Sequence, residues 1–280
     1  MSAFLTLHEP TLRLAAFAGV LALMALLEVA LPRRGRTGPR LHRWMTNVAL
    51  AGAGTIVLRI AVPLLAVGVA TLAEREGFGL FHWTGTPEVA AFVLSLIALD
   101  LLVYAQHVAF HKYGLLWRLH RVHHADTDVD ATTGIRFHPV EILISMAIKM
   151  VAVALLGAPA GAVILFEIVL NAAAMFNHSN FRIGPAADRW LRRIIVTPDM
   201  HRVHHSIHRD EHDMNFGFNL SFWDRLFGTY RAEPREGQEN MRLGLAEYPA
   251  PTPQGLGWSL MNPFWNSTNP DDTPRRERTI

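Results

Sequence analysis

The sequence predicts an all-α fold: a multi-pass membrane helix bundle that carries a histidine-rich helical cap on its cytoplasmic side. Half of the 280 residues are hydrophobic and the mean hydropathy is +0.18, so the chain is too apolar for an ordinary soluble domain. Several apolar stretches reach the roughly 20 residues that a helix needs to cross a hydrocarbon core of about 30 Å. Most of the 15 histidines lie between His107 and His212, in the gaps between these stretches or at their ends.

Four apolar stretches account for the predicted membrane helices. Three of them are each expected to cross the membrane once: residues 11–31, 46–72 and 88–110. Residues 141–177 are long enough for a hairpin of two shorter helices, broken at Gly157–Gly161 because glycine and proline interrupt helices. Glu167 lies inside this hairpin, and we expect it to pair with Lys149 on the antiparallel partner helix, because a charge in lipid needs a partner.

The distribution of arginine predicts how the chain is oriented. Five arginines directly follow the first apolar stretch: Arg33, Arg34, Arg36, Arg40 and Arg43. The positive-inside rule therefore places this loop in the cytoplasm, and the first stretch is expected to be a retained span, not a cleaved signal peptide. Counting spans from there puts residues 111–140 and everything after His178 on the same side. We expect a bacterial inner membrane with all histidine clusters on its cytoplasmic face.

Composition also excludes several classes of protein. The chain has no cysteine, which rules out disulfides, thiolate metal sites and Fe–S clusters. A metal must therefore be held by histidine, carboxylate or backbone oxygen. The net charge is only +2, and the arginines lie in separate loops, so nucleic acid is not expected as a partner.

Three tight histidine clusters carry the strongest chemical signal. Their patterns are His107-x-x-x-His111, His120-x-x-His123-His124 and His201-x-x-His204-His205. Positions i, i+3 and i+4 share one face of a helix, so each cluster is expected to direct its imidazoles at a common point. Thr197-Pro198-Asp199 predicts that a helix begins just before the third cluster, with Thr197 as its N-cap.

Further polar residues lie close to these clusters. His178 ends the hairpin and is expected to join the metal site, whereas His138 is expected either to bind metal or to bond Glu141 at the membrane surface. Asp100 is expected to fix a neighbouring helix or a ligand by a hydrogen bond, the alternative being a solvated carboxylate. His208 is a candidate outer ligand. Four histidines are expected to be structural or to lie at the surface: His8, His42, His82 and His212.

The number of histidines predicts two metal ions. A single zinc site needs three or four protein ligands, whereas eight or nine histidines imply a dinuclear, all-nitrogen site. The spacing does not choose the metal, because imidazole suits iron, zinc, copper and nickel. Two other functions stay open at this point: a zinc-dependent membrane hydrolase and a non-catalytic metal carrier or sensor. The hydrolase lacks a glutamate inside any cluster, unlike the H-E-x-x-H arrangement.

The three clusters, in this order, resemble the histidine boxes of the fatty acid hydroxylase and sterol desaturase superfamily, HxxxH, HxxHH and a second HxxHH. The resemblance covers about residues 95–231 and is closest to the bacterial branch. Seven segments carry it: Asp100–His107, Trp117–His124, Phe137–Glu141, Asn177–Ser179, Met200–Ser206, Asn215–Gly217 and Trp223–Tyr230.

This resemblance implies an O2-dependent oxidation of a lipid C–H bond at two iron ions, by hydroxylation or desaturation of a sterol, fatty acyl chain or related lipid. Zinc is an alternative occupant in isolated protein, because some family members bind it. The implied ligands are His107, His111, His120, His123, His124, His178, His201, His204 and His205, with His138, His208, Asp100, Glu141 and Asn177 as additional or supporting residues. Fungal fatty acid hydroxylases carry another histidine one turn before His178, where this chain has Ala174.

The chain contains no motif for a fused haem or flavin, so electrons are expected from a separate reductase, ferredoxin or cytochrome. We expect this donor to dock near Arg189–Arg193 on the cytoplasmic face. Three regions are predicted: residues 1–94 with the first membrane helices and the basic loop, residues 95–231 as the catalytic domain, and residues 232–280 as a Pro-rich polar surface extension with a disordered end.

Overall fold

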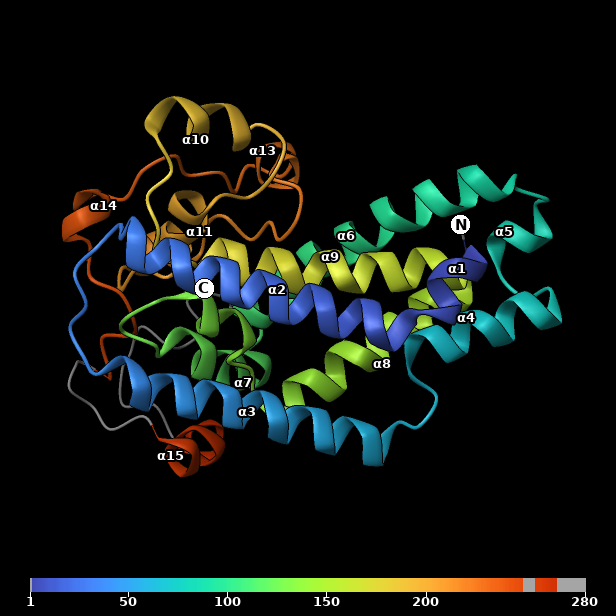
Figure 1. The fold of residues 1–280 in the computed structure, drawn as a ribbon, viewed down its shortest axis with the longest axis horizontal. Coiled ribbons are helices and arrows are strands. Elements are labelled where there is room, and N and C mark those ends of the chain that lie inside the picture. The colour runs from blue at the N-terminus through green and yellow to red at the C-terminus, as the bar shows by residue number, and fades with distance from the viewer. Residues whose placement is uncertain (1, 249–254, 266–280) are drawn as a thin grey trace, which may run out of the picture.

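The computed structural model describes residues 2–248 and 255–265, and it is an elongated bundle of helices (Figure 1). The described residues form helices and three isolated β-bridges but no strand, which confirms the all-α prediction. The bundle contains α1 (Ser2–Leu7), α2 (Glu9–Ala30), α3 (Arg40–Ala61), α4 (Leu65–Glu76), α5 (Leu80–Trp83), α6 (Glu88–Lys112), α8 (Pro139–Leu156) and α9 (Ala160–His178). The cap at one end contains α7 (Gly114–His124), η1 (Ala131–Ile135), α10 (Pro185–Leu191), α11 (Pro198–His204), α12 (Arg209–His212), α13 (Phe222–Leu226), α14 (Gly237–Asn240), α15 (Leu256–Met261) and η2 (Asn262–Phe264).

Five stretches among the described residues are long and apolar enough to cross a membrane, which supports the multi-pass prediction. The helices α2 and α6 match the predicted spans within a few residues, and α8 and α9 form the predicted hairpin. Between α8 and α9, Gly157 adopts a left-handed conformation with φ +66° and Pro159 precedes the first turn of α9. Glycine adopts positive φ without the steric cost of a Cβ, so the hairpin turns at this point.

The predicted single span over residues 46–72 is wrong in one respect. The structure divides it into α3 and α4, with a break at Val62, Pro63 and Leu64. Proline has no N–H to donate, and its ring disfavours the helical conformation in the preceding residue, so α3 ends before Pro63. Both helices pack against α8.

The helix α9 is the most enclosed of the five candidate spans and lies among α2, α4 and α6 (Figure 1). Its Val163 and Phe166 pack with Leu99 of α6 and Val153 of α8 in the largest buried apolar cluster. By contrast, the outward faces of the other long helices expose large apolar side chains such as Ile60 and Val89, as expected of surfaces that contact lipid.

Glu167 of α9 is buried and forms an ion-paired network inside the bundle. Its carboxylate accepts a hydrogen bond of 2.7 Å from Lys149, which confirms the predicted pair. A second cation, Arg13 of α2, donates to Glu167 over 2.6 Å and also pairs with Glu9. The sequence analysis missed Arg13 because the path of α2 beside α9 cannot be read from local pattern. The network holds three membrane helices together through neutralised charges.

We expect Glu167→Ala to lower the apparent Tm of the detergent-solubilised chain strongly. The substitution leaves Lys149 and Arg13 without their shared carboxylate, and breaking one partner of a buried ion pair costs about 3–5 kcal/mol. Glu9→Ala is the matched control, because Glu9 pairs with the same Arg13 at a partly exposed position and its loss should be nearly neutral. Equal Tm values for the two variants would contradict this account of the network.

The cap is joined to the bundle by buried polar contacts. Glu28 of α2 accepts hydrogen bonds from the backbone N–H groups of Ala131 and Asn180, at 2.7 and 3.0 Å. The 3₁₀-helix η1 lies so close to α9 that a Cβ on Gly134 would be 2.4 Å from the carbonyl oxygen of Ala174. Glycine is therefore required where η1 meets α9, directly beside the turn that carries His178.

The prediction that residues from Arg231 onward form only a surface extension is wrong for the described part. Arg34 donates to the backbone carbonyls of Gln238 and Met241, and Met241 is buried. The buried guanidinium of Arg121 in α7 bonds the side chain and carbonyl of Asn262. Polar composition concealed this packing because the contacts are mainly hydrogen bonds to the backbone. The predicted disordered end of this region lies outside the described residues.

Candidate metal centre

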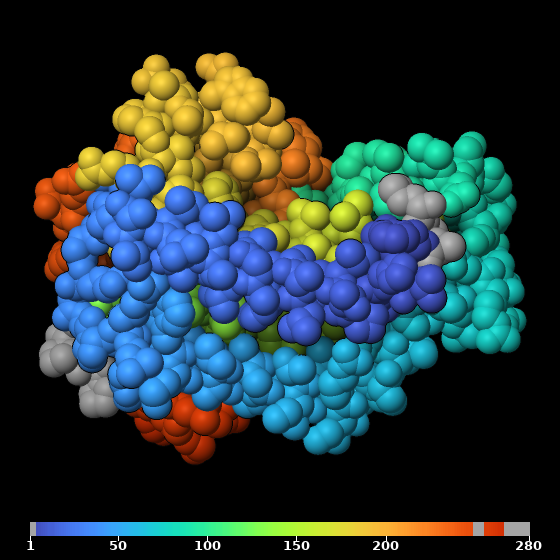
Figure 2. All heavy atoms as spheres, viewed as in Figure 1, coloured from blue at the N-terminus to red at the C-terminus, as the bar shows by residue number. Residues whose placement is uncertain are grey.

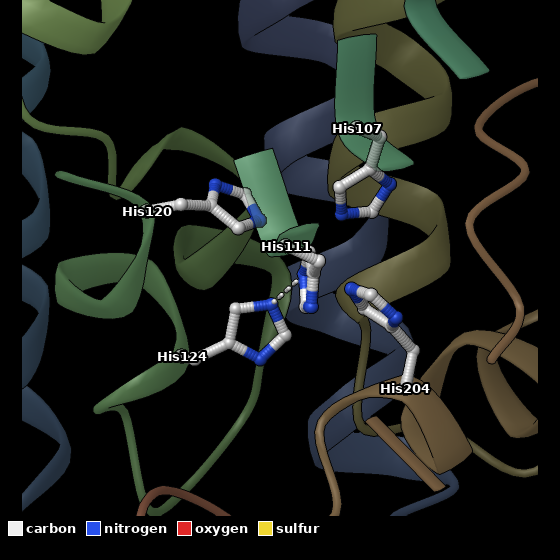
Figure 3. A group of neighbouring side chains, drawn as sticks. All are labelled: His107, His111, His120, His124 and His204. Atoms are coloured by element: carbon white, nitrogen blue, oxygen red, sulfur yellow. Dashed lines mark hydrogen bonds between the residues drawn. The ribbon is translucent and has the colours of Figure 1, made fainter. Parts of the chain in front are cut away.

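Nine histidines converge in the cap as two neighbouring groups, and all nine are buried. Within each group the potential ligand nitrogens lie within 4.8 Å of one another. Figure 3 shows the first group, whose members come from the end of α6, from α7 and from α11: His107, His111, His120, His124 and His204. The second group joins α7, the end of α9 and α11: His123, His178, His201 and His205. These are the nine residues that the sequence analysis singled out as ligands.

The two HxxHH clusters divide between the groups. In α7, His120 and His124 belong to the first group and His123 to the second. In α11, His204 belongs to the first group and His201 to the second, together with His205, the residue after the helix. A helix turns by about 100° per residue, so positions i and i+4 are about 40° apart, while i+3 and i+4 diverge by about 100°. The expectation that each cluster aims at one common point is therefore corrected: each HxxHH cluster contributes to two adjacent points.

Hydrogen bonds at Nδ1, on the side of the ring away from Nε2, orient five of these nine rings. The Nδ1 atoms of His107 and His204 bond the carbonyl oxygens of Phe216 and Met214, both at 2.8 Å. His178 bonds the Ala174 carbonyl at 2.6 Å, and His123 bonds that of Arg136 at 3.3 Å. The Nδ1 of His120 bonds a carboxylate oxygen of Glu141 at 2.7 Å. Because each Nδ1 must donate its proton to an oxygen, each Nε2 is left with a lone pair directed into its group.

The inner nitrogens fit metal ions. The Nε2 atoms of His107, His120 and His204 are buried and have no hydrogen-bond partner among the described residues. The Nε2 atoms of His123 and His178 face each other at 3.0 Å, although both rings donate through Nδ1. Two lone pairs at this distance repel unless a cation lies between them. An ion that binds imidazole nitrogen at about 2.1 Å could contact both Nε2 atoms at this separation.

Burial keeps the histidines of the cap in the form that binds metal. It lowers the pKa of His120 to about 3, and it lowers the pKa values of His123, His124 and His201 well below their ordinary value, as it does for His204 and His205. The neighbouring imidazoles lower the pKa values of these last five rings further, since each would repel a second positive charge. Neutral imidazole is the metal ligand, so these rings are ready to bind ions at neutral pH.

The structure does not bring His138 or His208 into either group. His138 caps α8 by accepting from the N–H of Val140, and its Nε2 lies 3.2 Å from the carbonyl oxygen of Leu260. His208 bonds a carboxylate oxygen of Glu236 at 3.1 Å. His208 and His212 do not continue the helix that carries His201, because α11 ends at His204. Thr197 does cap α11, as predicted.

Asp100 and Asn177 support the segment that follows α12. Asp100 accepts hydrogen bonds from the indole of Trp223 at 2.8 Å and from the N–H of Leu220 at 3.3 Å. Asn177 donates to the carbonyl of Phe218 at 2.6 Å. These contacts fix the loop whose Phe216 carbonyl orients His107. The placement agrees with the expectation that Asp100 fixes a neighbouring element.

Other residues behind the ligands were missed by the sequence analysis. His212, expected at the surface, is buried with its ring stacked on Trp117, and the adjacent Asp213 has a carboxylate oxygen 3.5 Å from Nδ1 of His111. After the end of α7, Asp126 accepts two hydrogen bonds of 2.8 Å from Arg43. The spacing of residues near His212 and Asp213 does not predict these contacts. For Asp126, the alternation of Asp126, Asp128 and Asp130 after the second cluster was the sequence signal.

We expect Glu141→Ala to weaken metal binding in the first group by about 10–100-fold, the usual effect of losing a carboxylate that orients a ligand histidine. Glu141→Gln should lose less, because its amide oxygen can still accept the His120 proton. Chelator competition on the purified chain would measure both changes. Glu236→Ala is the matched control, since Glu236 bonds a histidine outside both groups. Equal metal retention by Glu141→Ala and the control would contradict the role assigned to Glu141.

Comparison with known proteins identifies the family. The family model for fatty acid hydroxylase matches residues 92–229, the part of the chain that contains all nine histidines of the two groups. An ornithine lipid hydroxylase of Rhizobium tropici is 29% identical over 237 residues, covering 81% of this chain and 69% of that protein.

Other relatives match a smaller share of the chain. An alkylglycerol monooxygenase of Danio rerio is 32% identical over 55% of the chain, and a very-long-chain aldehyde decarbonylase of Oryza sativa is 31% identical over 60%. The matches cover 34% and 28% of these longer relatives. No solved structure matched the chain. The family match, the relatives and the nine converging histidines agree, and the chain belongs to the fatty acid hydroxylase superfamily of lipid-oxidising membrane enzymes.

Proposed function

We propose that the chain is a membrane di-iron oxygenase that uses O2 and external electrons to hydroxylate or desaturate a lipid. One observation carries the proposal: two adjacent, buried groups of five and four histidines, each able to surround one ion. Nine imidazoles exceed the three or four protein ligands of one zinc site and therefore support two ions, and iron is one of the metals that imidazole suits. Membership of the fatty acid hydroxylase superfamily supports iron as the metal in the cell.

The residues around the two groups orient the ligands and exclude water. When bound, the metal pair would supply the activation of O2. Phe137 lies parallel to His123 with the ring centres 4.6 Å apart, and Phe218 lies against His107 and His201. These aromatic walls, together with the complete burial of the ligands, favour a dry site in which an oxidant is protected from water.

A lipid substrate is supported by where the groups lie in the chain. Three of the histidines lie in the last turns of α6 and α9, two of the candidate spans, so a lipid could approach along these helices without leaving the apolar phase. The names of the relatives, an ornithine lipid hydroxylase among them, support the same class of substrate. We place the site on the cytoplasmic face of a bacterial inner membrane, because the basic loop before α3 lies at the same end as the cap (Figure 1).

A lipid comparison under isotopic O2 tests the proposal. Cells that express the chain, or lack it, are grown under ¹⁸O2 and their lipid extracts are compared by mass spectrometry. A product that gains one labelled oxygen indicates hydroxylation, and a product that loses two hydrogens without label indicates desaturation. Purified protein should contain about two iron ions per chain. Identical lipid extracts, with zinc and no iron after growth in iron-rich medium, would overturn the proposal.

The zinc hydrolase alternative requires a general base beside a metal-bound water. Both groups consist of histidine alone among the described residues, and Glu141 contacts His120 from behind, on the Nδ1 side. Glu141 therefore points away from the position that a metal-bound water would occupy, and Asp213 approaches His111 at Nδ1, 3.5 Å away, on the side opposite the Nε2 that faces His124. A hydrolase would retain full activity without O2, which the same comparison of lipids tests in cells kept under nitrogen.

A separate electron donor completes the proposal, because the chain contains no cysteine for an Fe–S cluster. The stretch Arg189–Arg193, predicted to receive this donor, is not uniformly exposed. Arg192 is buried, forms an ion pair with Asp188 and donates to the carbonyl of Ala232, so it maintains the fold of the cap. A test of electron-donor docking therefore leaves Arg192 unchanged and changes exposed residues of the cap.

A further inference from the structure

Two segments of the cap, Arg189–Ile195 and Leu220–Phe227, form a single surface that includes the end of α10 and all of α13. The N–H of Ser221 donates to the carbonyl of Ile194 at 3.1 Å, and the hydroxyl of Ser221 donates to that of Arg192 at 2.7 Å. Figure 2 shows that the part of the chain carrying α10 projects from the body of the molecule. We call these two segments the α10–α13 surface.

The α10–α13 surface is both apolar and basic. Its large apolar side chains are 40–61% exposed: Trp190, Ile194, Phe222, Leu226 and Phe227. Within these two segments, all of which the structure describes, the exposed charged side chains are Arg189, Arg193 and Arg225. The acidic side chain in this region, Asp224, is buried and bonds the N–H groups of Phe216 and Gly217. Soluble proteins rarely expose such a set of neighbouring large apolar side chains without a partner.

The α10–α13 surface contacts α6 close to the end of this candidate membrane span. Phe227 stacks on Tyr104 of α6 with the ring centres 5.3 Å apart, and Trp223 bonds Asp100 one turn earlier. At 1.5 Å per residue, Tyr104 lies about 24 Å from the start of α6 at Glu88, near the end of a hydrocarbon core of about 30 Å. The α10–α13 surface therefore packs on α6 near the end of its candidate membrane span.

We propose that the α10–α13 surface lies on the bilayer at the histidine end of the bundle. Trp190, Phe222 and Leu226 would enter the interfacial layer, and the exposed arginines would contact the phosphates of anionic phospholipids. This combination of aromatic and aliphatic side chains with basic residues is characteristic of segments that bind membrane surfaces. A purely electrostatic protein partner would explain the arginines but not the five exposed apolar side chains at membrane level.

This contact would anchor part of the metal centre. Asp224 in α13 holds the backbone of Phe216, whose carbonyl orients His107. The membrane would thereby fix the loop beside the first histidine group on the side from which a lipid could enter. The inference rests on the multi-pass membrane fold and not on the proposed oxidation, so it stands or falls independently of the reaction.

Spin-label accessibility in nanodiscs, each holding one copy of the full chain, tests the proposal. The chain has no cysteine, so Leu226→Cys and Ile194→Cys each provide a single site for a nitroxide. Arg36→Cys, exposed in the loop between α2 and α3, is the matched control. We expect labels at 226 and 194 to collide several-fold more often with O2 than with a water-soluble nickel chelate, and the label at 36 to show the reverse. Labels at 226 and 194 that favour the nickel chelate, or that reach neither reagent, would overturn the proposal.

The arginines are tested by lipid composition. We expect the Leu226 label to lie deeper in discs that contain phosphatidylglycerol than in discs of phosphatidylcholine alone. Arg189→Glu combined with Arg193→Glu should abolish this difference, whereas Arg36→Glu should leave it unchanged. The same depth in both lipids for the unmodified surface would refute contact between the arginines and anionic headgroups. Discs with a single copy exclude a second chain as the cause of any protection.

Discussion

His204→Ala is expected to empty the first metal position, and His205→Ala the second, although the two residues are adjacent in sequence. His204 belongs to the group of five histidines and His205 to the group of four. Losing a residue that only supports a ligand costs 10–100-fold in affinity or activity, so losing a ligand should reduce lipid oxidation by more than about 100-fold. Each variant should retain the ion in the other group.

Metal analysis and anomalous X-ray scattering on crystals of the two variants would locate the ion that each has lost. His208→Ala is the control, because His208 has the same side chain four residues from His204 but bonds Glu236 outside both groups. It should keep both ions and full activity. Loss of the same ion in His204→Ala and His205→Ala would show that the division into two groups is wrong.

The sequence predicted the architecture well where one physical rule dominates. Long apolar runs identify α2, α6, α8 and α9 because each must hide its backbone polar groups from lipid over a fixed thickness. The break between α3 and α4 was not predicted. Pro63 lies inside an otherwise continuous apolar run, so the mean hydropathy of the run hardly changes at this residue. Composition detects that a segment is apolar, but the single residue that ends a helix contributes little to such an average.

The structure brings together the nine histidines that were predicted as candidate ligands, but their division into two groups was not predicted. Which imidazoles share an ion depends on how α7 and α11 are rotated relative to α6 and α9, and this rotation is set by packing contacts between distant segments. The supporting carbonyls of Phe216 and Met214 could not be predicted at all, because backbone atoms carry no sequence signature.

Long-range polar contacts account for most of the remaining differences. Arg13 reaches Glu167 across 154 positions of the chain, and Arg121 reaches Asn262 across 141. His212 is buried because the chain turns back after α11 and stacks its ring on Trp117. Arg13, Arg121 and His212 were assigned to the surface or left unassigned, because an isolated polar residue is usually solvated and the partner lies far away in sequence.

The metal-free chain is expected to be less stable than the iron-loaded chain, and less stable at pH 5.5 than at pH 7.5. Ions that bind only the folded state stabilise it by about 4 kcal/mol when present at 1,000 times their Kd. Without them, lone pairs such as those of His123 and His178 face each other at 3.0 Å. The metal-free chain should therefore unfold at a lower temperature than the iron-loaded chain at both pH values.

The pH dependence follows from the lowered pKa values of the six buried histidines in the cap. Unfolded histidines bind protons near pH 6.5, whereas His120 in the folded chain has a pKa of about 3. Below pH 6.5 the unfolded state therefore binds more protons, and the stability present above this pH is lost as the pH falls. Each such histidine contributes about 1.4 kcal/mol per pH unit between the two pKa values.

Thermal unfolding in detergent, with and without iron and at both pH values, measures this loss. The metal-free Tm should fall steeply between pH 7.5 and 5.5. His208→Ala is again the control and should follow the parent curve, because His208 is partly exposed and lies outside both groups. A metal-free Tm that does not change with pH would mean that the histidines are accessible to protons in the folded chain. Buried, neutral imidazoles explain both effects, because the features that prepare them for metal also leave them without partners once it is removed.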